Sequence, residues 1–159
     1  MVKLMERGKV SRRQERGAAL VELAIGAGVF FTALFAVLEF SRLMWTHNAL
    51  ADATRRGARY ASISSKSAAN VKNFVVYGTI SPGAGAKPVV YGLTTGNVNV
   101  TYSTGDVIDS FGVQNGTVTV QITGYQFNLS VPLLGAAITL PDYRAVATGE
   151  SAGYVPPNI

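Results

Sequence analysis

The stretch AALVELAIGAGVFFTALFAVL at residues 18–38 decides the fold, because it is almost entirely apolar and follows a strongly charged N-terminus. As a helix, residues 20–38 would rise about 28 Å, close to the ~30 Å hydrocarbon thickness of a bilayer. The stretch is longer than the roughly 7–15 apolar residues of an ordinary signal peptide. We therefore predict that residues 20–38 span a membrane.

Basic residues are concentrated before this stretch. Residues 1–17 hold six Lys or Arg and two Glu, which leaves +1 of the net charge of +5 for the remainder of the chain. The twenty residues after Leu38 contain three Arg. Because cytoplasmic flanks of membrane helices are enriched in Lys and Arg, this bias predicts a cytoplasmic N-terminus and an external remainder. The nearly neutral remainder also argues against binding to nucleic acid.

One carboxylate, Glu22, interrupts the apolar stretch. Burying an ionised side chain in a membrane costs at least ~2.5–3.5 kcal/mol of free energy, so an acidic residue in this position indicates that it has a functional role. Cleavage after Gly17 would create an ammonium group at Ala18, one helical turn from Glu22. Since desolvated charges need partners, we expect Glu22 to pair with the N-terminus of another subunit and to set the register of polymerisation. The alternative is a membrane-helix acid that finds some other neighbour.

The helix is predicted to continue beyond the membrane to residue 61. Apolar and small side chains recur every three or four positions from Phe40 to Ala61 and form one stripe. The opposite face carries the charged residues Arg42, Asp52, Arg55 and Arg59. Glu39 is spaced to pair with Arg42, and Asp52 is spaced to pair with Arg55 and Arg56. Each such pair contributes only ~0.2–0.5 kcal/mol on an exposed face.

Beyond a polar connector, the period of the apolar residues changes from 3.6 to 2. Alternation predicts antiparallel strands at 98–102, 117–123 and 125–131. Further strands are predicted at Phe74–Tyr77 and Tyr143–Thr148. The apolar positions change from even to odd numbers at Gly124, which predicts a bulge or kink there. Asn115-Gly116 is a candidate hairpin turn.

The chain is therefore divided into five segments. They are a leader at 1–17, a helix at 18–61, a connector at 62–70, an antiparallel β domain at 71–150 and a frayed tail at 151–159. A sheet domain of about 80 residues buries only a modest fraction of its surface. We expect it to pack on the amphipathic half of the helix, so the predicted class is α+β, a long transmembrane and amphipathic helix packed against a small antiparallel sheet.

The composition excludes most kinds of catalytic site. The chain has no cysteine and one histidine, His47, so it has no disulfide, no thiolate metal site and no ordinary catalytic triad. We expect His47 to be a packed or surface residue. Asp106 and Asp109 match no calcium-binding loop, and we interpret them as solvated turn residues. The sequence predicts no enzyme activity, no cofactor and no metal.

Three blocks of sequence together resemble one family. They are RRQERGAALVELA at 12–24, EFSRLMW at 39–45 and ATRRGARYA at 53–61. In this order and spacing they are similar to the TadE-like minor pilins, or pseudopilins, of the tight-adherence (Flp) type IV pilus system. The resemblance covers about a third of the chain and implies a type IV pilin-like fold.

The resemblance also implies a processing and assembly pathway. Gly17 and Ala18 would flank the bond cut by a prepilin peptidase, and Glu22 would act in recognition or assembly. The implied partners are that peptidase, the major Flp pilin, a second minor pilin, an inner-membrane assembly platform and the lipid bilayer before assembly. The product would pass from the bacterial inner membrane to an extracellular pilus or the periplasm and support surface adhesion. Leu23 stands where major Flp pilins usually have an aromatic residue, and the 142 residues left after cleavage exceed a major pilin's length, which favours a minor subunit.

Two other classes remain open at this point. The first is an uncleaved, single-pass membrane-anchored protein with an external β-rich binding domain. The second is a secreted adhesive domain, released by ordinary signal peptidase near Ala51, which would leave the sheet without its helix. A pilus subunit and a subunit of a secretion pseudopilus would also share these signals.

Overall fold

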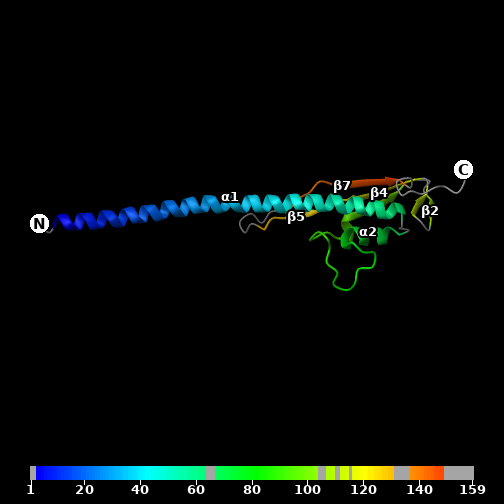
Figure 1. Cartoon of the computed structure of the whole chain (residues 1–159), viewed down its shortest axis with the longest axis horizontal. Helices are drawn as coiled ribbons and strands as arrows, with labels where there is room; N and C mark the ends of the chain where they lie inside the picture. Colours follow the sequence, from blue (N-terminus) through cyan, green and yellow to red (C-terminus); the bar gives the residue numbers. More distant parts are fainter. Residues whose placement is uncertain are drawn as a thin grey trace. The chain divides into compact units, whose positions relative to one another are not determined.

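The computed structural model describes residues 3–63, 67–103, 107–109, 112–114, 116–130 and 137–148. Contacts divide the chain into two compact units, Met1–Ser41 and Arg42–Ile159. In chain order the elements are the helices α1 (Lys3–Ile63) and α2 (Ala68–Tyr77), the short 3-10 helix η1 (Thr95–Asn97), and the strands β1 (Val98–Tyr102), β2 (Val107–Asp109), β3 (Gly112–Gln114), β4 (Thr117–Ile122), β5 (Gln126–Asn128), β6 (Ala137–Thr139) and β7 (Tyr143–Thr148) (Figure 1).

The described part of the first unit is the N-terminal stretch of α1. Large apolar side chains on all sides of this helix are exposed from Leu20 to Leu38. A helix that is apolar all round is stable in a membrane or against other apolar helices. Its side chains have no core of their own to enter within the unit.

The second unit is built around a three-stranded antiparallel sheet in the order β1-β4-β7. The central strand β4 pairs with β1 through Val100 and Val120, and with β7 through Ile122 and Tyr143. Alternate residues of β4 are buried, namely Val118, Val120 and Ile122, and each has 0% of its surface exposed. The sheet therefore has one apolar face that requires a cover.

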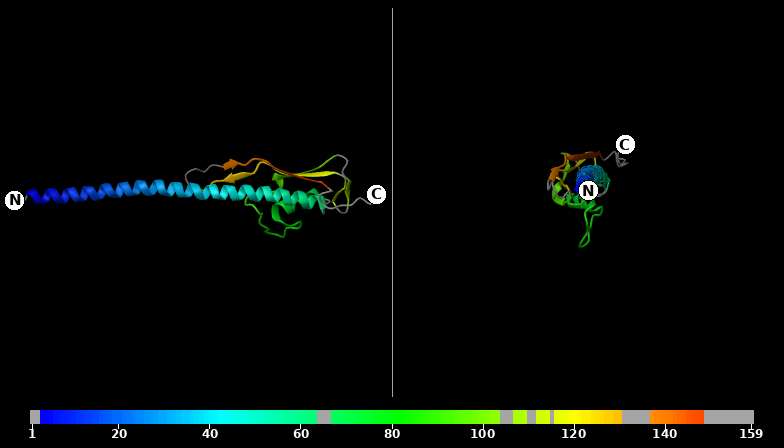
Figure 2. Two further views of the ribbon diagram at one scale, coloured as in Figure 1. Left: turned by 45° about the horizontal axis from the view of Figure 1, so that its top comes forward. Right: turned by 90° about the vertical axis from the view of Figure 1, so that its left-hand side faces the viewer.

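The cover is provided by the second half of α1. Leu50, Ala53, Ala58 and Ala61 are buried together with the apolar residues of β1, β4 and β7. Strands β4 and β7 run along one side of this stretch of α1, and α2 lies along another side, as the different views agree (Figures 1 and 2). The expected packing of the sheet on the amphipathic half of the helix is confirmed, and with it the predicted α+β class, which is consistent with a pilin-like fold.

The expected stripe on α1 is confirmed in its outer part. Leu50, Thr54, Gly57 and Ala61 are buried. Near its start the stripe is open, since Phe40 is 61% exposed. The residues predicted on the opposite face, Arg42, Asp52, Arg55 and Arg59, are exposed.

The strand predicted at Phe74–Tyr77 is wrong, because these residues form the end of α2. β-Branched and aromatic residues favour strands, but this preference depends on context. Here Val71, Val75 and Val76 are all buried at helical spacing, and the Phe74 ring stacks on Tyr60 with 4.5 Å between centroids. Gly78 ends the helix in the left-handed conformation at φ 72°, and its N–H donates to the Phe74 carbonyl. Tertiary burial therefore decides the conformation.

The change of parity at Gly124 is a sharp bend of the chain. Gly124 has φ 65°, a left-handed conformation that glycine adopts without strain. Ile122 before it and Tyr125 and Phe127 after it are all buried, as the alternation predicted. The chain does not continue as one bulged strand, because β4 ends at Ile122 and β5 pairs with β6 in a separate two-stranded sheet.

The remaining predictions are met in different degrees. Strands β1 and β7 occupy the ranges predicted for them. The connector is shorter than expected, because α1 runs to Ile63 and α2 starts at Ala68. Asn115 lies outside the described residues, and the strands on either side of the expected turn have other partners, since β3 pairs with β2. The tail at 151–159 also lies outside the described residues.

Gly57→Ala is expected to destabilise the second unit. The added methyl group would clash with Cγ2 of Val75 and lie 3.5 Å from Cγ1 of Val120. Overpacking of this kind typically costs about 1–3 kcal/mol. Urea unfolding in detergent micelles, followed by Trp45 fluorescence, measures the loss. Gly28→Ala is the matched control, because nothing lies within 4 Å of its new methyl group.

Val75→Ala in the Gly57→Ala background should recover part of the loss by removing the clashing methyl groups. Equal urea midpoints for Gly57→Ala and the unmodified chain would contradict the three-way packing of α1, α2 and β4.

Candidate functional site

Gly17 and Ala18 lie in the interior of α1, which begins fourteen residues earlier, at Lys3. Both residues are exposed, and nothing lies within 4 Å of a Cβ placed on Gly17. Gly17 is therefore not a helix-capping glycine. An interior helix glycine costs roughly 0.5–1 kcal/mol relative to alanine, so the helix is locally weakened at this bond.

Glu22 lies farther along the same helix and is exposed. Its flanking residues Val21 and Leu23 are 60% and 67% exposed, so the carboxylate is set in an apolar surface. Within the described residues Glu22 makes no hydrogen bond or ion pair. Ala18 and Glu22 are four residues apart, which places them on one face of the helix about 6 Å apart along its axis.

The helix that carries these residues meets the length and composition required to cross a membrane. One helix among the described residues meets both requirements, and it runs from Glu15 to Ile63. None of its most apolar 18-residue stretch is buried. This observation fits membrane anchoring, as predicted for residues 20–38. Because a core helix of a soluble protein is mostly buried, the full exposure of this stretch favours a membrane or a neighbouring helix as its environment.

Glu39 and Arg42, predicted to form an i, i+3 pair, have different surroundings. Glu39 is 7% exposed, whereas Arg42 is exposed. The Arg42 guanidinium lies over the Phe127 ring at 5.2 Å from its centroid, and its Nη1 donates to Ser130 Oγ at 2.6 Å. The pairing with Glu39 stays a prediction. The other predicted charge pair is seen between Arg56 Nε and Asp52 Oδ2 at 3.2 Å.

Arg42 borders a hollow of about 310 Å³ on the second unit, which we call the aromatic hollow. Buried Val90, Tyr125 and Phe127 contribute to its lining, whereas Trp45 and Tyr91 are 62% and 88% exposed. The Tyr125 hydroxyl donates to the Tyr91 carbonyl at 2.6 Å and fixes that loop against the strand region. The hollow thus combines exposed aromatic rings with one oriented cation.

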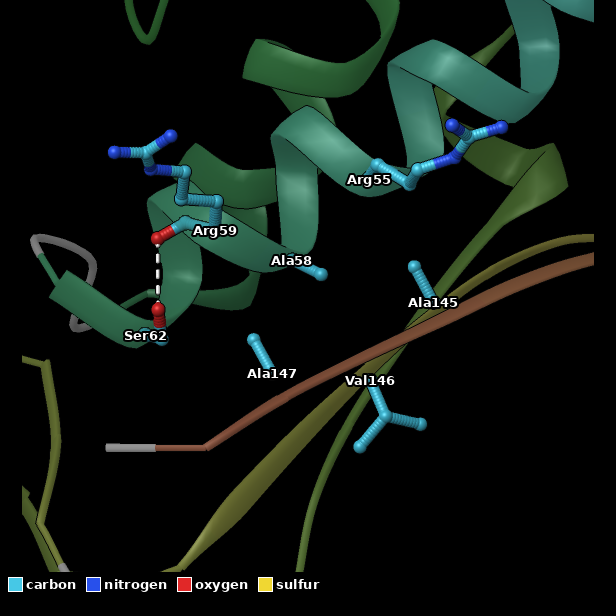
Figure 3. A pocket seen from close by; sticks show the side chains of 7 residues that line it. All are labelled: Arg55, Ala58, Arg59, Ser62, Ala145, Val146 and Ala147. Carbon is cyan, nitrogen blue, oxygen red and sulfur yellow. Dashed lines mark hydrogen bonds between the residues drawn. The ribbon is translucent and has the colours of Figure 1, made fainter. Parts of the chain in front are cut away.

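A second hollow, of about 420 Å³, lies between α1 and β7. Ala58 on the helix faces Ala145 and Ala147 on the strand, and Val146 points away from α1 (Figure 3). The short alanine side chains leave this groove open. Arg55 and Arg59 stand on its helix side, where Ser62 Oγ donates to the Arg59 carbonyl at 2.9 Å.

Residues 17–59 match the family model described as TadE-like protein. The chain carries a TadE-like segment. The match starts at Gly17 and includes Glu22, Glu39 and Arg42, so the predicted recognition is confirmed on the residues that suggested it. No curated protein and no solved structure matches the chain.

The matched segment covers 43 of the 159 residues and lies wholly within α1. Among the described residues no group of His, Cys, Asp or Glu is arranged to hold a metal ion. His47 is packed, as expected, with its Nδ1 2.8 Å from the Tyr143 hydroxyl. Asn97 and Asn99 near the rejected calcium site use their amides in hydrogen bonds to Thr123. Asp106 and the side chain of Asp109 lie outside what the structure describes.

Sequence reasoning missed the surroundings of Arg42. Ser130 is 88 residues away in the chain, and Tyr91 comes from a loop with no helical or strand pattern. The sequence offers one relevant signal, the aromatic residue Phe127 in a strand with alternating polarity. That signal indicates burial and does not identify Arg42 as its neighbour.

Three tyrosines of the second unit have perturbed acidity. Burial raises the pKa of Tyr102 above its ordinary value of 10.0. Burial also raises the pKa of Tyr125, although the nearby Arg42 charge opposes the shift. For Tyr143, burial and then Tyr125 raise the pKa. The folded state favours the neutral phenol in each case, so these tyrosines ionise at lower pH in the unfolded chain than in the folded one. The stability that they contribute is therefore present below pH 10.0 and is lost as the pH rises above that value.

Tyr102→Phe tests this pH dependence of stability without removing a hydrogen bond. The Tyr102 hydroxyl is buried and has no hydrogen-bond partner among the described residues. Replacing an unsatisfied buried hydroxyl should leave the unfolding free energy unchanged or raise it by up to about 1 kcal/mol at neutral pH. Thermal unfolding by circular dichroism should show a smaller loss of stability above pH 10.0 than in the unmodified chain.

Tyr143→Phe is the comparison, because it removes the bond to His47 and should lower stability already at neutral pH. Identical alkaline profiles for Tyr102→Phe and the unmodified chain would contradict the assigned role of the Tyr102 hydroxyl.

Proposed function

We propose that this protein is a structural minor pilin or pseudopilin, processed by a prepilin peptidase and assembled through its N-terminal helix into a tight-adherence pilus or its initiation complex. The observation that carries the proposal is the exposed Glu22 carboxylate in an apolar helix, within a TadE-like segment that starts at Gly17. Adhesion of the cell to surfaces is the function that such an assembly serves.

The state of Gly17 in the helix supports cleavage at this bond. A protease active site holds its substrate extended, so the helix must open before the Gly17–Ala18 bond can be cut. The interior glycine lowers the cost of opening by roughly 0.5–1 kcal/mol relative to alanine. Cleavage on this side of the apolar stretch would leave the membrane helix in the mature protein, whereas ordinary signal peptidase would remove it.

The charges created by cleavage support assembly. A new ammonium at Ala18 and the Glu22 carboxylate would both lie at the start of an apolar helix, where each is costly without a partner. Pairing Glu22 of one subunit with the terminus of the next neutralises both charges. It also fixes the axial offset between neighbouring helices, because a mismatch of even one helical turn separates the two groups by about 5 Å.

The proposed route sets the partners and locations. Before assembly the chain is anchored in the bacterial inner membrane with its N-terminus in the cytoplasm. Its partners are the prepilin peptidase, the major Flp pilin, a second minor pilin and the inner-membrane assembly platform. After extraction from the membrane, the second unit would lie on a filament outside the cell or in the periplasm.

A permanently anchored binding protein is the second candidate, and the exposed aromatic hollow is the observation that favours it. In that case the leader would be retained, and Glu22 would affect the membrane helix alone. The two candidates therefore differ in the mass of the mature chain.

Gly17→Ala is expected to block processing. Intact-mass spectrometry of the protein isolated from its native host should show the unmodified chain starting at Ala18 and the variant at full length. The stiffer helix accounts for only about a two- to fivefold loss, so the block is attributed mainly to the methyl group that alanine adds beside the cut. A leader retained in both chains would support the anchored alternative, and a chain starting near Asp52 would indicate ordinary secretion and refute assembly.

Glu22→Gln is expected to abolish incorporation into pili while the processed protein remains in the membrane. Removing this charge lowers the cost of membrane residence, which is at least about 2.5–3.5 kcal/mol for an ionised side chain, and leaves the neighbouring ammonium without a partner. Immunoblotting of sheared pili and of membranes measures both pools. Glu15→Gln is the matched control, because the same change falls in the leader. Normal incorporation of Glu22→Gln would contradict the proposed pairing.

A further inference from the structure

The aromatic hollow has a composition suited to the surface of a membrane. Trp45 and Tyr91 expose large rings that each carry one polar group, and such rings concentrate at the level of lipid headgroups. Arg42 supplies a cation beside them, held over Phe127 and bonded to Ser130. A guanidinium in a fixed orientation is well suited to bind the phosphate of a lipid.

The position of the hollow along the chain agrees with this partner. Arg42 and Trp45 follow Leu38 by four and seven residues, or about 6 and 10 Å along a helix. The headgroup layer extends about 5–8 Å beyond the hydrocarbon on each side of a bilayer. Side chains on a helix generally cover the turn N-terminal to their own Cα, which brings a ring at position 45 nearer to that layer than its backbone.

We propose that the aromatic hollow docks the second unit on phospholipid headgroups while the protein is anchored, with Trp45 and Tyr91 in the headgroup layer and Arg42 on a lipid phosphate. This inference rests on the proposed membrane insertion of residues 20–38. It adds a membrane-bound face to the second unit, and that face must be released before the subunit enters a filament.

The groove between α1 and β7 offers the matched control surface. It is lined by Arg55 and Ser62, which lie about 20–30 Å farther along α1 than Arg42. Val146 in this region is 52% exposed and points away from α1 (Figure 3). When the hollow is docked, Val146 should therefore remain in water.

The test uses the full chain in vesicles of phosphatidylethanolamine and phosphatidylglycerol. Trp45 is the one tryptophan of the chain, so a single fluorophore can be moved at will. Three proteins are compared: the unmodified chain, Trp45→Phe with Tyr91→Trp, and Trp45→Phe with Val146→Trp. Each is quenched by a nitroxide attached to the lipid headgroup, by bromine near the ends of the acyl chains, and by iodide in the water.

Headgroup nitroxide should quench the tryptophan at positions 45 and 91 most strongly, whereas iodide should quench the one at position 146. Arg42→Gln should lower the equilibrium constant for docking by about fivefold, which is the effect of one basic side chain at an anionic surface. The tryptophan at position 91 should then be quenched more by iodide. Arg55→Gln, the same change of charge outside the hollow, should leave it unchanged. Circular dichroism of both variants checks that the second unit stays folded.

The inference is overturned if iodide quenches the tryptophan at position 91 as readily as the one at position 146. Quenching of Trp45 by lipid would not rescue it, because the helix alone could bring Trp45 to the headgroup layer. It is also overturned if position 91 is shielded from iodide only when other pilus proteins are added, which would identify a protein as the occupant. Flotation of the vesicles separates this failure from that of the anchor. A chain that floats but does not dock leaves the proposed function intact, and a chain that does not float refutes both.

Discussion

The sheet of the second unit cannot form a core without α1. Its buried face is a row of valine and isoleucine side chains on β1 and β4, and the apolar surface opposite them belongs to Leu50, Ala53, Ala58 and Ala61 of the helix. With no cysteine in the chain, no disulfide can replace this contact. A small sheet without covalent links depends on such a cover for stability. The helix that carries the apolar stretch is therefore also part of the folded core.

This dependence argues against release of the external part as a free domain. A cut near Ala51 would remove Leu50 and separate the remaining helix from its N-terminal turns. A cut after Gly17 removes nothing that contributes to the core. Of the two cuts considered, the one after Gly17 keeps all the described core residues on one chain.

Sequence patterns predicted the structure correctly where the spacing of apolar residues within one segment determines its conformation. The apolar stretch, the stripe from Leu50 to Ala61 and the alternation in β4 and β7 each follow from a periodicity that burial imposes on one element. The residues Gly17 and Glu22 stand out for the same reason, since each is an exception within a regular stretch. α2 was mispredicted because its valines favour strands locally, and their helical conformation is set by contacts with α1 and β1.

The surroundings of Arg42 could not be predicted, for a related reason. Phe127 and Ser130 reach this arginine only through the bend at Gly124. Tyr91 joins the same hollow through the packing of the loop before η1, where its carbonyl accepts a hydrogen bond from Tyr125. These contacts join residues separated by tens of positions, and nothing in one segment specifies its partner in another. The candidate site residues Gly17 and Glu22 can thus be identified from the sequence, whereas the aromatic hollow is formed only by the fold.

The β7 edge of the sheet has a consequence for the behaviour of crowded copies. In the order β1-β4-β7, the six-residue strand β7 has no strand on its outer side among the described residues, and its Arg144 is exposed. Unpaired edges invite strands of other molecules to join them. Here the positive charges of Arg55 and Arg59 stand near that edge, so two copies approaching through β7 would repel one another. Copies of this chain that are held close together are therefore less prone to join through β7.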